Sequence, residues 1–380
     1  MIYFDNSATT KPYPEVIEAF TKVATLYFGN PSSVHKLGSE AERLIYQSRE
    51  YIGKLLSVHP SEIVFTSGGT EGNNLAIKGT ALRYRNRGKH IIATSIEHAS
   101  IQEGLKQLEK HGYEVTYLPV NEAGVITIQQ VKDAIRIDTI LVTVIHVNNE
   151  VGTIQPIFEI GQLLNRYPQI FFHVDDVQGI GKVPLQIKES NIDLLTVSGH
   201  KFHGLKGTGF MYVRKGIELE PLFTGGSQEN ELRAGTENVP GIVSMTKALR
   251  MTLEEGEEKI LHLTKLKNHL YKLLDEMSFA KINTPSEGTA PHILNFSIPG
   301  AKPETIVHAL EKYEIYVSTK SACSSKQVSA SRILLEMGKP ERIASSAIRV
   351  SLSAENTLVE IEKFYHAMNE IVEQNIVIMR

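Results

Sequence analysis

The chain contains the run Asp193-Leu194-Leu195-Thr196-Val197-Ser198-Gly199-His200-Lys201. Its apolar first half is typical of a short buried strand, and polar residues follow at once. The upstream run Phe171-Phe172-His173-Val174-Asp175 has the same character and ends on a carboxylate. In an open α/β sheet, ligands bind in the crevice at the carboxyl ends of the strands. We therefore expect Asp175 and Lys201 to face one crevice.

Asp175 and Lys201 together indicate a particular cofactor. A carboxylate that pairs with a pyridinium nitrogen and a lysine that forms a Schiff base are the protein groups that pyridoxal phosphate (PLP) needs most. A lysine at the end of a strand is more often a solvated surface residue, since lysine is almost never buried without a partner. The combination of the lysine with the carboxylate favours the cofactor site over that simpler interpretation.

Strands and helices alternate through the first part of the chain. Helical periodicity predicts helices at residues 15–28, 39–56, 74–84, 99–111, 128–137 and 157–167, and short apolar runs predict strands at 62–66, 90–94, 114–118, 139–146, 171–175, 193–197 and 207–213. Such alternation predicts an α/β fold with a largely parallel sheet that helices cover on both faces.

The pattern changes after about Pro240. One long amphipathic helix is predicted from 243 to 276, and a mixed series follows, with strands at 292–298, 315–318 and 347–352 and helices at 304–313, 329–337 and 358–374. We therefore predict a large PLP-binding domain over residues 15–255, and a smaller α+β domain formed by residues 1–14 and 256–380.

Composition limits the class of protein. The chain has 380 residues, of which 41% are hydrophobic and 22% charged, as in ordinary globular enzymes. The net charge of -3 offers no electrostatic reason to bind nucleic acid or an anionic membrane. No signal peptide and no apolar run of about 18 residues is evident. Cys323 is the single cysteine, so an intrachain disulfide or a thiolate metal site is excluded, and a cytoplasmic enzyme is expected.

The segment 67–74, rich in glycine, follows a predicted strand and opens a helix. Glycines let backbone amides approach an anion, and the helix N-terminus adds the positive end of its dipole. Gly69 and Thr70 are thus candidate phosphate ligands, with Ser198 and His200 as further contacts. The alternative is a tight turn between strand and helix with an N-cap. No Gly-Lys-Ser/Thr follows, so a nucleotide P-loop is excluded.

Further polar residues follow other predicted strands. His98 comes after the strand at 90–94, where an imidazole could stack on a flat ring, although a single histidine is more often structural. Asn149 and Gln178 could hydrogen-bond the cofactor ring or the substrate. Each residue is a weak indication alone, and together they point at one crevice.

Two residues near the C-terminus suggest reaction with an amino acid. A free cysteine is usually a small buried hydrophobe, whereas the small polar neighbours and nearby lysines of Cys323 suggest an exposed thiol of depressed pKa, and this segment alone leaves both interpretations open. Arg349 lies on a predicted apolar strand and needs an anionic partner. That partner is either a substrate carboxylate, held by the bidentate guanidinium, or the acid of a structural salt bridge.

Motifs along nearly the whole chain carry a family resemblance. In order, they are Tyr3-Phe4-Asp5-Asn6-Ser7-Ala8-Thr9-Thr10, Gly29-Asn30-Pro31-Ser32-Ser33, Ser67-Gly68-Gly69-Thr70-Glu71, Glu97-His98, His146-Val147-Asn148-Asn149-Glu150-Val151-Gly152, His173-Val174-Asp175, Ser198-Gly199-His200-Lys201, Arg233-Ala234-Gly235-Thr236-Glu237-Asn238, Ser321-Ala322-Cys323 and Ile348-Arg349-Val350-Ser351. The chain resembles the cysteine desulfurases of the NifS/IscS kind, which are class-V aminotransferases with the PLP-dependent transferase fold of type I.

The resemblance implies the site residues. Lys201, Cys323 and His98 are catalytic: Lys201 binds PLP covalently, Cys323 takes the sulfur and His98 stacks on the ring. Substrate binding falls to Asn149 and Arg349, with Arg349 on the carboxylate. The cofactor-binding residues are Gly69, Thr70, His98, Asn149, Asp175, Gln178, Ser198, His200, Lys201 and Thr236, where Thr236 reaches the phosphate of a neighbouring subunit.

The resemblance also implies activity and partners. The enzyme would remove sulfur from L-cysteine, release L-alanine and leave a persulfide on Cys323. The persulfide would pass to an acceptor protein for iron–sulfur cluster assembly or for thiolation of tRNA or a cofactor. A homodimer is implied, and no resident metal, although Cys323 could transiently contact iron on a scaffold.

Other functions of the same fold remain possible, and two positions depart from the family motifs. An aminotransferase or selenocysteine lyase of the same fold would have less need of Cys323, and an idle scaffold would not need Lys201 and Asp175. Asp176 stands where the family often has a small residue, and the segment 326–330 replaces the usual stretch with glycine and proline.

Overall fold

A sheet of seven strands forms the centre of the molecule. In the computed structural model, which describes residues 1–254, 256–319 and 330–376, the strand order is β2-β8-β7-β6-β5-β3-β4. Strands β3 to β7 pair in parallel, whereas β8 is antiparallel to both β7 and β2. The strands are β2 (Ile63–Thr66), β3 (His90–Thr94), β4 (Glu114–Leu118), β5 (Thr139–Ile145), β6 (Phe171–Asp175), β7 (Leu194–Ser198) and β8 (Gly209–Val213). The predicted α/β fold with a mainly parallel sheet is confirmed.

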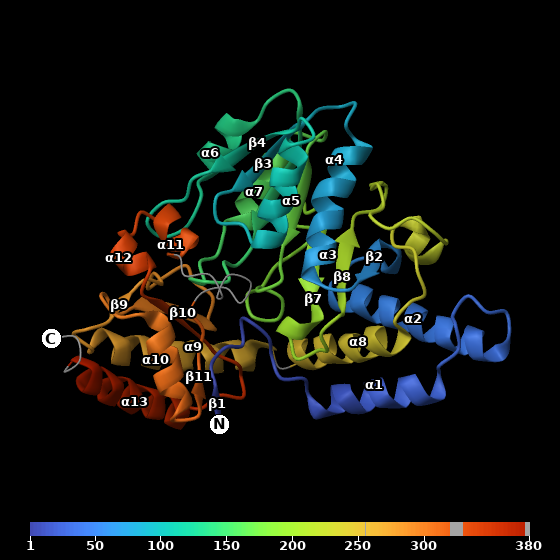
Figure 1. The fold of residues 1–380 in the computed structure, drawn as a ribbon. Coiled ribbons are helices and arrows are strands. Elements are labelled where there is room, and N and C mark those ends of the chain that lie inside the picture. The colour runs from blue at the N-terminus through green and yellow to red at the C-terminus, as the bar shows by residue number, and fades with distance from the viewer. Residues whose placement is uncertain (255, 320–329, 377–380) are drawn as a thin grey trace.

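Helices cover both faces of this sheet (Figure 1). Successive strand residues point to opposite faces, so Phe172 joins one hydrophobic cluster and Phe171 another. The Phe172 cluster includes residues of α1 (Pro14–Leu26), α2 (Lys36–Leu55), α6 (Ile128–Ala134), α7 (Ile157–Leu164) and α8 (Val239–Leu253). The opposite face carries α5 (Ala99–Glu109) and a continuous helical segment made of α3 (Gly69–Asn74), a π-helical turn (Leu75–Gly79) and α4 (Thr80–Arg83).

A second hydrophobic core lies in the C-terminal part of the chain. It gathers Phe4, Leu270, Phe296 and Phe364, among others. Its small sheets are β12-β10-β9 and β1-β11, packed by α9 (Gly256–Asp275), α10 (Pro303–Glu311) and α13 (Leu358–Ile376). The strands are β1 (Ile2–Tyr3), β9 (Lys281–Ile282), β10 (Ile293–Ser297), β11 (Ile315–Tyr316) and β12 (Ala347–Ser351). Two cores are compatible with two domains, and the boundary at residue 255 stays a prediction.

Two short helices contact the large sheet from the C-terminal part. They are α11 (Arg332–Glu336) and α12 (Glu341–Ala344), and Leu334 and Ala344 cluster with Ile96 and Ile145. This contact brings the C-terminal part against the carboxyl ends of β3 and β5. Across the described part of the chain, no helix has the length and apolar character needed to cross a membrane.

The prediction of one long helix from 243 to 276 is wrong. Helix α8 ends before Glu254, whose φ of -62° and ψ of 132° are extended, and α9 begins at Gly256. The two helices bury their apolar faces in different cores: α8 packs on α1 and α2, and α9 packs on α13. A single straight helix could not serve both cores. Strands β1 and β9 were not predicted, because two residues are too few to show a periodicity.

Candidate active site

A cavity of about 280 Å³ lies at the carboxyl ends of β6 and β7. Asp175 is the last residue of β6, and Lys201 lies in a 3-10 turn (Gly199–Lys201) directly after β7. Parallel strands end at one edge of the sheet, which is why residues from distant segments meet here. The lining residues are Ser7, Ala8, Gly69, Thr70, Asn73, His98, Ser100, Ile145, Asn149, Asp175, Val177, Gln178, Ser198, His200, Lys201 and Arg349.

Asp175 forms one end of the cavity and is only 2% exposed. Asn73 Nδ2 donates to its Oδ2 at 2.7 Å, and the Val177 N–H donates to its Oδ1 at 3.0 Å. Burial raises the pKa of Asp175, and the facing His98 and both hydrogen bonds lower it. The two donors therefore favour the carboxylate that a pyridinium nitrogen would need.

His98 begins α5 as its N-cap. Its Nδ1 lies 2.8 Å from Ser100 Oγ and accepts the Ser100 N–H at 3.2 Å. Asn73 Nδ2 also donates to Ser100 Oγ, at 2.9 Å, so the serine proton is left for His98 Nδ1. Burial lowers the pKa of His98, while Asp175 raises it. The imidazole is thus held by its Nδ1 edge, in the network that also holds Asp175.

Lys201 reaches across the cavity to the N-terminal segment. Its Nζ donates to the carbonyl oxygens of Ser7 at 2.5 Å and Ala8 at 2.8 Å. Gln178 Nε2 donates to the same Ser7 oxygen at 2.9 Å. Residues 7 and 8 therefore form a wall that holds the lysine amine in the cavity.

The start of α3 also lines the cavity. Gly68, with φ of 145°, adopts a backbone conformation that favours glycine, and it is the N-cap of α3. Gly69 and Thr70 occupy the first turn, beside Ser198 and His200. Burial, reinforced by the charge of Lys201, lowers the pKa of His200 to about 4, so its imidazole is neutral. Amides, hydroxyls and a neutral imidazole suit a phosphate group.

Arg349, on β12, is 1% exposed and is held by two partners. Its Nη2 pairs with Asp5 Oδ1 at 2.8 Å, and its Nη1 donates to the Asn149 carbonyl at 2.8 Å. The salt bridge considered in the sequence analysis is therefore present. Its Nε has no hydrogen-bond partner among the described residues, although the side chain lines the cavity.

Buried polar atoms without a hydrogen-bond partner, here called unmatched, indicate whether the cavity fits PLP. Ser7 Oγ, Asn73 Oδ1, Gln178 Oε1 and Arg349 Nε are buried and have no hydrogen-bond partner in the described part of the chain. Such atoms are rare in folded proteins, and here they surround one cavity. With an amine, a buried carboxylate and an anion cradle around the same space, the residues present fit PLP.

Ten of the predicted site residues line this cavity. They are Gly69, Thr70, His98, Asn149, Asp175, Gln178, Ser198, His200, Lys201 and Arg349. Thr236 does not line it: it is exposed in the loop between a 3-10 turn (Gln228–Glu231) and α8. Cys323 lies outside the described residues.

The sequence analysis did not identify Asn73, Ser100 or the carbonyls of Ser7 and Ala8 as parts of the site. Asn73 stands four residues after Gly69 in the same helical segment, and this spacing on one helix face could have identified it. No local pattern indicates that residues 7 and 8 meet Lys201.

Comparisons with known proteins agree with this geometry. Residues 2–364 match the family described as aminotransferase class-V. The chain is 47% identical to a NifS/IcsS protein homolog of Lactobacillus delbrueckii subsp. bulgaricus, covering 98% of this chain and 97% of that one. It is 42% identical to the putative cysteine desulfurase IscS 1 of Bacillus subtilis, covering 98% and 99%.

Solved structures show the same likeness. A NifS-like protein superposes with a TM-score of 0.92 at 39% identity, covering 98% of this chain and 99% of that one. A second structure, SspA in complex with cysteine, has a TM-score of 0.82 at 35% identity, covering 94% and 100%.

Proposed function

Because the chain belongs to the class-V aminotransferases and, within them, to the PLP-dependent cysteine desulfurases, we propose that it desulfurates L-cysteine in the cavity between Asp175 and Lys201. The supporting observation is that a lysine amine, a buried carboxylate and an anion cradle surround one cavity edged by unmatched polar atoms.

The residues of the cavity divide the binding task. Lys201 would hold PLP covalently, and Asp175, which accepts a hydrogen bond from Asn73, would pair with the ring nitrogen. Gly69, Thr70, Ser198 and His200 would hold the phosphate. His98, Gln178 and Asn149 would contact the ring. Arg349 binds the carboxylate of the substrate, with its unmatched Nε as the available donor.

Bound PLP supplies an electron sink for the charge that remains when the Cα proton of the substrate leaves. The Lys201 amine, held at the cavity wall by the Ser7 and Ala8 carbonyls, accepts that proton. The Cys323 thiolate attacks the substrate sulfur, so that a sulfur–sulfur bond forms and the carbon–sulfur bond breaks. The carbon skeleton takes up a proton and leaves as L-alanine, and the persulfide remains on Cys323.

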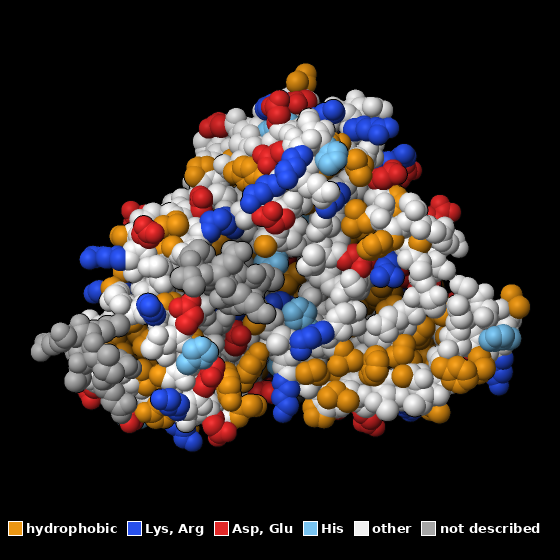
Figure 2. Space-filling view, in the orientation of Figure 1, with side chains coloured by type: hydrophobic (Ala, Val, Ile, Leu, Met, Phe, Trp, Pro, Cys, Tyr) orange, Lys and Arg blue, Asp and Glu red, His pale blue; other side chains and the backbone are white. Residues whose placement is uncertain are grey.

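We further propose a homodimer in which Thr236 contacts the PLP phosphate of the partner. Thr236 is exposed and away from its own cavity. Exposed apolar side chains on and beside α1 and α2 support self-association, and Figure 2 shows hydrophobic side chains gathered over α1 and its neighbours. They include Ile17, Leu26, Phe28, Val34, Tyr46 and Tyr51.

The proposal also covers the division of the chain into domains and the transfer of sulfur to an acceptor. Residues 15–255 would form the PLP-binding domain, and residues 1–14 and 256–380 the smaller domain that carries Cys323. The sulfur would pass to a cytoplasmic acceptor protein, for iron–sulfur cluster assembly or for thiolation of tRNA or a cofactor.

The test is a combined assay. Purified protein is examined for PLP absorbance, then given L-cysteine and a reductant, and alanine and sulfide are measured together. We expect equal yields of both products. Cys323→Ala should keep the PLP absorbance and lose sulfur release, and Lys201→Ala should release no alanine. A coloured wild-type protein that makes neither product would contradict the desulfurase function.

A further inference from the structure

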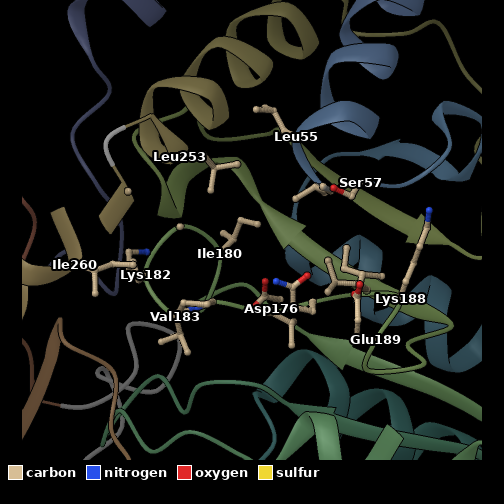
Figure 3. A pocket seen from close by; sticks show the side chains of 18 of the residues that line it. Leu55, Ser57, Asp176, Ile180, Lys182, Val183, Lys188, Glu189, Leu253 and Ile260 are labelled. Atoms are coloured by element: carbon tan, nitrogen blue, oxygen red, sulfur yellow. The ribbon is translucent and has the colours of Figure 1, made fainter. Parts of the chain in front are cut away.

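Asp176 is a second acid next to Asp175, and the proposed reaction leaves it without a task. It is 2% exposed, and its N–H donates to the Thr196 carbonyl at 3.0 Å, which continues the pairing of β6 with β7. Asp175 lines the PLP cavity, whereas Asp176 lines a neighbouring cavity of about 440 Å³ (Figure 3). Consecutive residues of extended chain point in opposite directions, which explains the division.

His146 contacts Asp176 through its side chain and Asp175 through its backbone N–H. Its Nδ1 lies 2.6 Å from Asp176 Oδ1, and both side chains are at most 3% exposed. Its N–H donates to the Asp175 carbonyl at 2.9 Å. A Cβ on Gly179 would stand 2.1 Å from Asp176 Oδ1 and 2.4 Å from His146 Nδ1, so only glycine leaves room for the pair. The turn after β6 is therefore attached firmly to the end of β5.

Lys182 lies at the end of the same turn, and its side chain contacts the main chain of Lys201. Its N–H donates to the Gly179 carbonyl at 2.8 Å, and its Nζ donates to the Lys201 carbonyl at 2.8 Å. Figure 3 shows Lys182 and Asp176 lining the same cavity. Burial lowers the pKa of Lys182 to about 8, and Asp176 raises it. Within the described ranges no carboxylate lies in ion-pair distance of Lys182, so Asp176 is the charge that favours its ammonium form.

We propose that Asp176, His146 and Lys182 are positioning residues that set the distance between the Asp175 carboxylate and Lys201 across the PLP cavity. One end of the turn follows Asp175 directly and is attached to the end of β5 by the contact between His146 and Asp176. The other end is bound to the main chain of Lys201 through Lys182. None of the three is among the residues that line the PLP cavity. The inference rests on the proposed function, because it concerns the geometry of the same site.

The main test removes the donor with Lys182→Met. We expect the dissociation constant of PLP to rise about tenfold, because the main chain of Lys201 loses the bond that keeps its amine in place. Cofactor-free protein is titrated with PLP, and the share of PLP attached to Lys201 is read by mass spectrometry after borohydride reduction. That share should fall, whereas a purely structural change would lower thermal stability alone.

Two matched variants accompany it. Lys182→Arg keeps a charged donor, and the adjoining cavity leaves room for the larger head group, so it should restore PLP binding and attachment. Lys188→Met makes the same change at an exposed lysine of the same cavity, which has no recorded bond to Lys201 in the described part of the chain, and it should match the wild type.

The outcomes are distinguishable. Wild-type affinity and attachment in Lys182→Met, or an equal loss in Lys188→Met, would overturn the positioning role. If Lys182→Met does not fold, Asp176→Asn decides, because it keeps the side-chain shape but removes the charge: weaker PLP binding supports the role, and unchanged binding overturns it. A wild-type protein that binds no PLP would instead overturn the proposed function.

Discussion

Single buried contacts decide the charge of the groups at this site. Burial raises the pKa of Asp175, and the charge of His98 and two donated hydrogen bonds, from Val177 and Asn73, lower it. Asn73 also donates to Ser100, which lies beside the imidazole of His98. Asn73 thereby connects Asp175 and His98, the two groups proposed to contact the PLP ring.

Asn73→Ala should weaken PLP binding about tenfold, since it removes a hydrogen bond to a buried carboxylate. Asn73→Asp should weaken it further, because a second acid would face Asp175 at close range. PLP titration of the cofactor-free proteins measures both effects. Equal affinities in the wild type and both variants would show that Asn73 does not support Asp175.

Arg349→Lys should raise KM for L-cysteine by about tenfold or more, because a lysine cannot reproduce the planar guanidinium fork. The variant kcat should change less, since the carboxylate lies away from the reacting sulfur. Asp5→Asn is the control: it removes the salt bridge to Arg349 but keeps the guanidinium, and its KM should rise less. Steady-state kinetics give KM for both variants. A larger rise in KM for Asp5→Asn than for Arg349→Lys would mean that Arg349 has a structural role and does not bind the substrate.

Strand β6 stabilises the sheet and also carries a residue of the site. His173, in the middle of the strand, bonds Thr143 of β5 at 2.9 Å and Thr196 of β7 at 3.0 Å. Its side chain therefore links three neighbouring strands, and Asp175 follows two residues later at the strand end. Burial lowers the pKa of His173 to about 3, so the ring is neutral in the folded protein.

This pKa predicts a pH dependence of stability. In the unfolded chain the imidazole takes up a proton below its ordinary pKa of 6.5, whereas in the fold it stays neutral down to about 3. The free energy of unfolding should therefore fall as pH drops below 6.5, by about 1.4 kcal/mol per pH unit from this residue. Urea unfolding of wild type and His173→Gln between pH 6.5 and 4.5 measures it.

The control is internal, because every other buried histidine is common to both proteins and cancels in the difference. As the pH decreases, the free energy of unfolding of His173→Gln should fall less steeply than that of the wild type, by about 1.4 kcal/mol per pH unit. Parallel curves for the two proteins would mean that His173 is already protonated in the fold, or that its protonation is not linked to unfolding.

At the scale of the whole molecule, the site is assembled from both ends of the chain. Asp5 pairs with Arg349, and the Ser7 carbonyl accepts from Lys201. The Ser351 carbonyl accepts from Asn6 Nδ2 at 3.0 Å, so the first residues are bound beside β12. The N-terminal segment thus spans from the second core to the cofactor cavity.

A mixing experiment tests the proposed sharing of sites between subunits. Thr236→Glu and Lys201→Ala chains should each be inactive alone, because one repels the phosphate and the other lacks the amine. Mixed after dissociation, they should regain about a quarter of the wild-type sites, since random pairing makes half of the dimers hybrid with one native site each. No recovery, with hybrid dimers verified by mass spectrometry, would place Thr236 outside the partner site.

Much of the fold follows from local pattern. The strands at 90–94 and 114–118 have the predicted limits, because a short apolar run between turns is typical of a buried strand. The prediction that Asp175 and Lys201 share a crevice also follows, since both stand at ends of neighbouring parallel strands.

The sequence by itself determined the alternation of strands and helices around the large sheet and the residue types of the PLP site, because both depend on neighbouring positions in the chain. Only the tertiary structure decided the break between α8 and α9, the reach of Lys201 to the Ser7 carbonyl and the pairing of Asp176 with His146. Each of these depends on segments far apart in the chain. Their contacts arise from how two cores pack, and no local periodicity reports that packing.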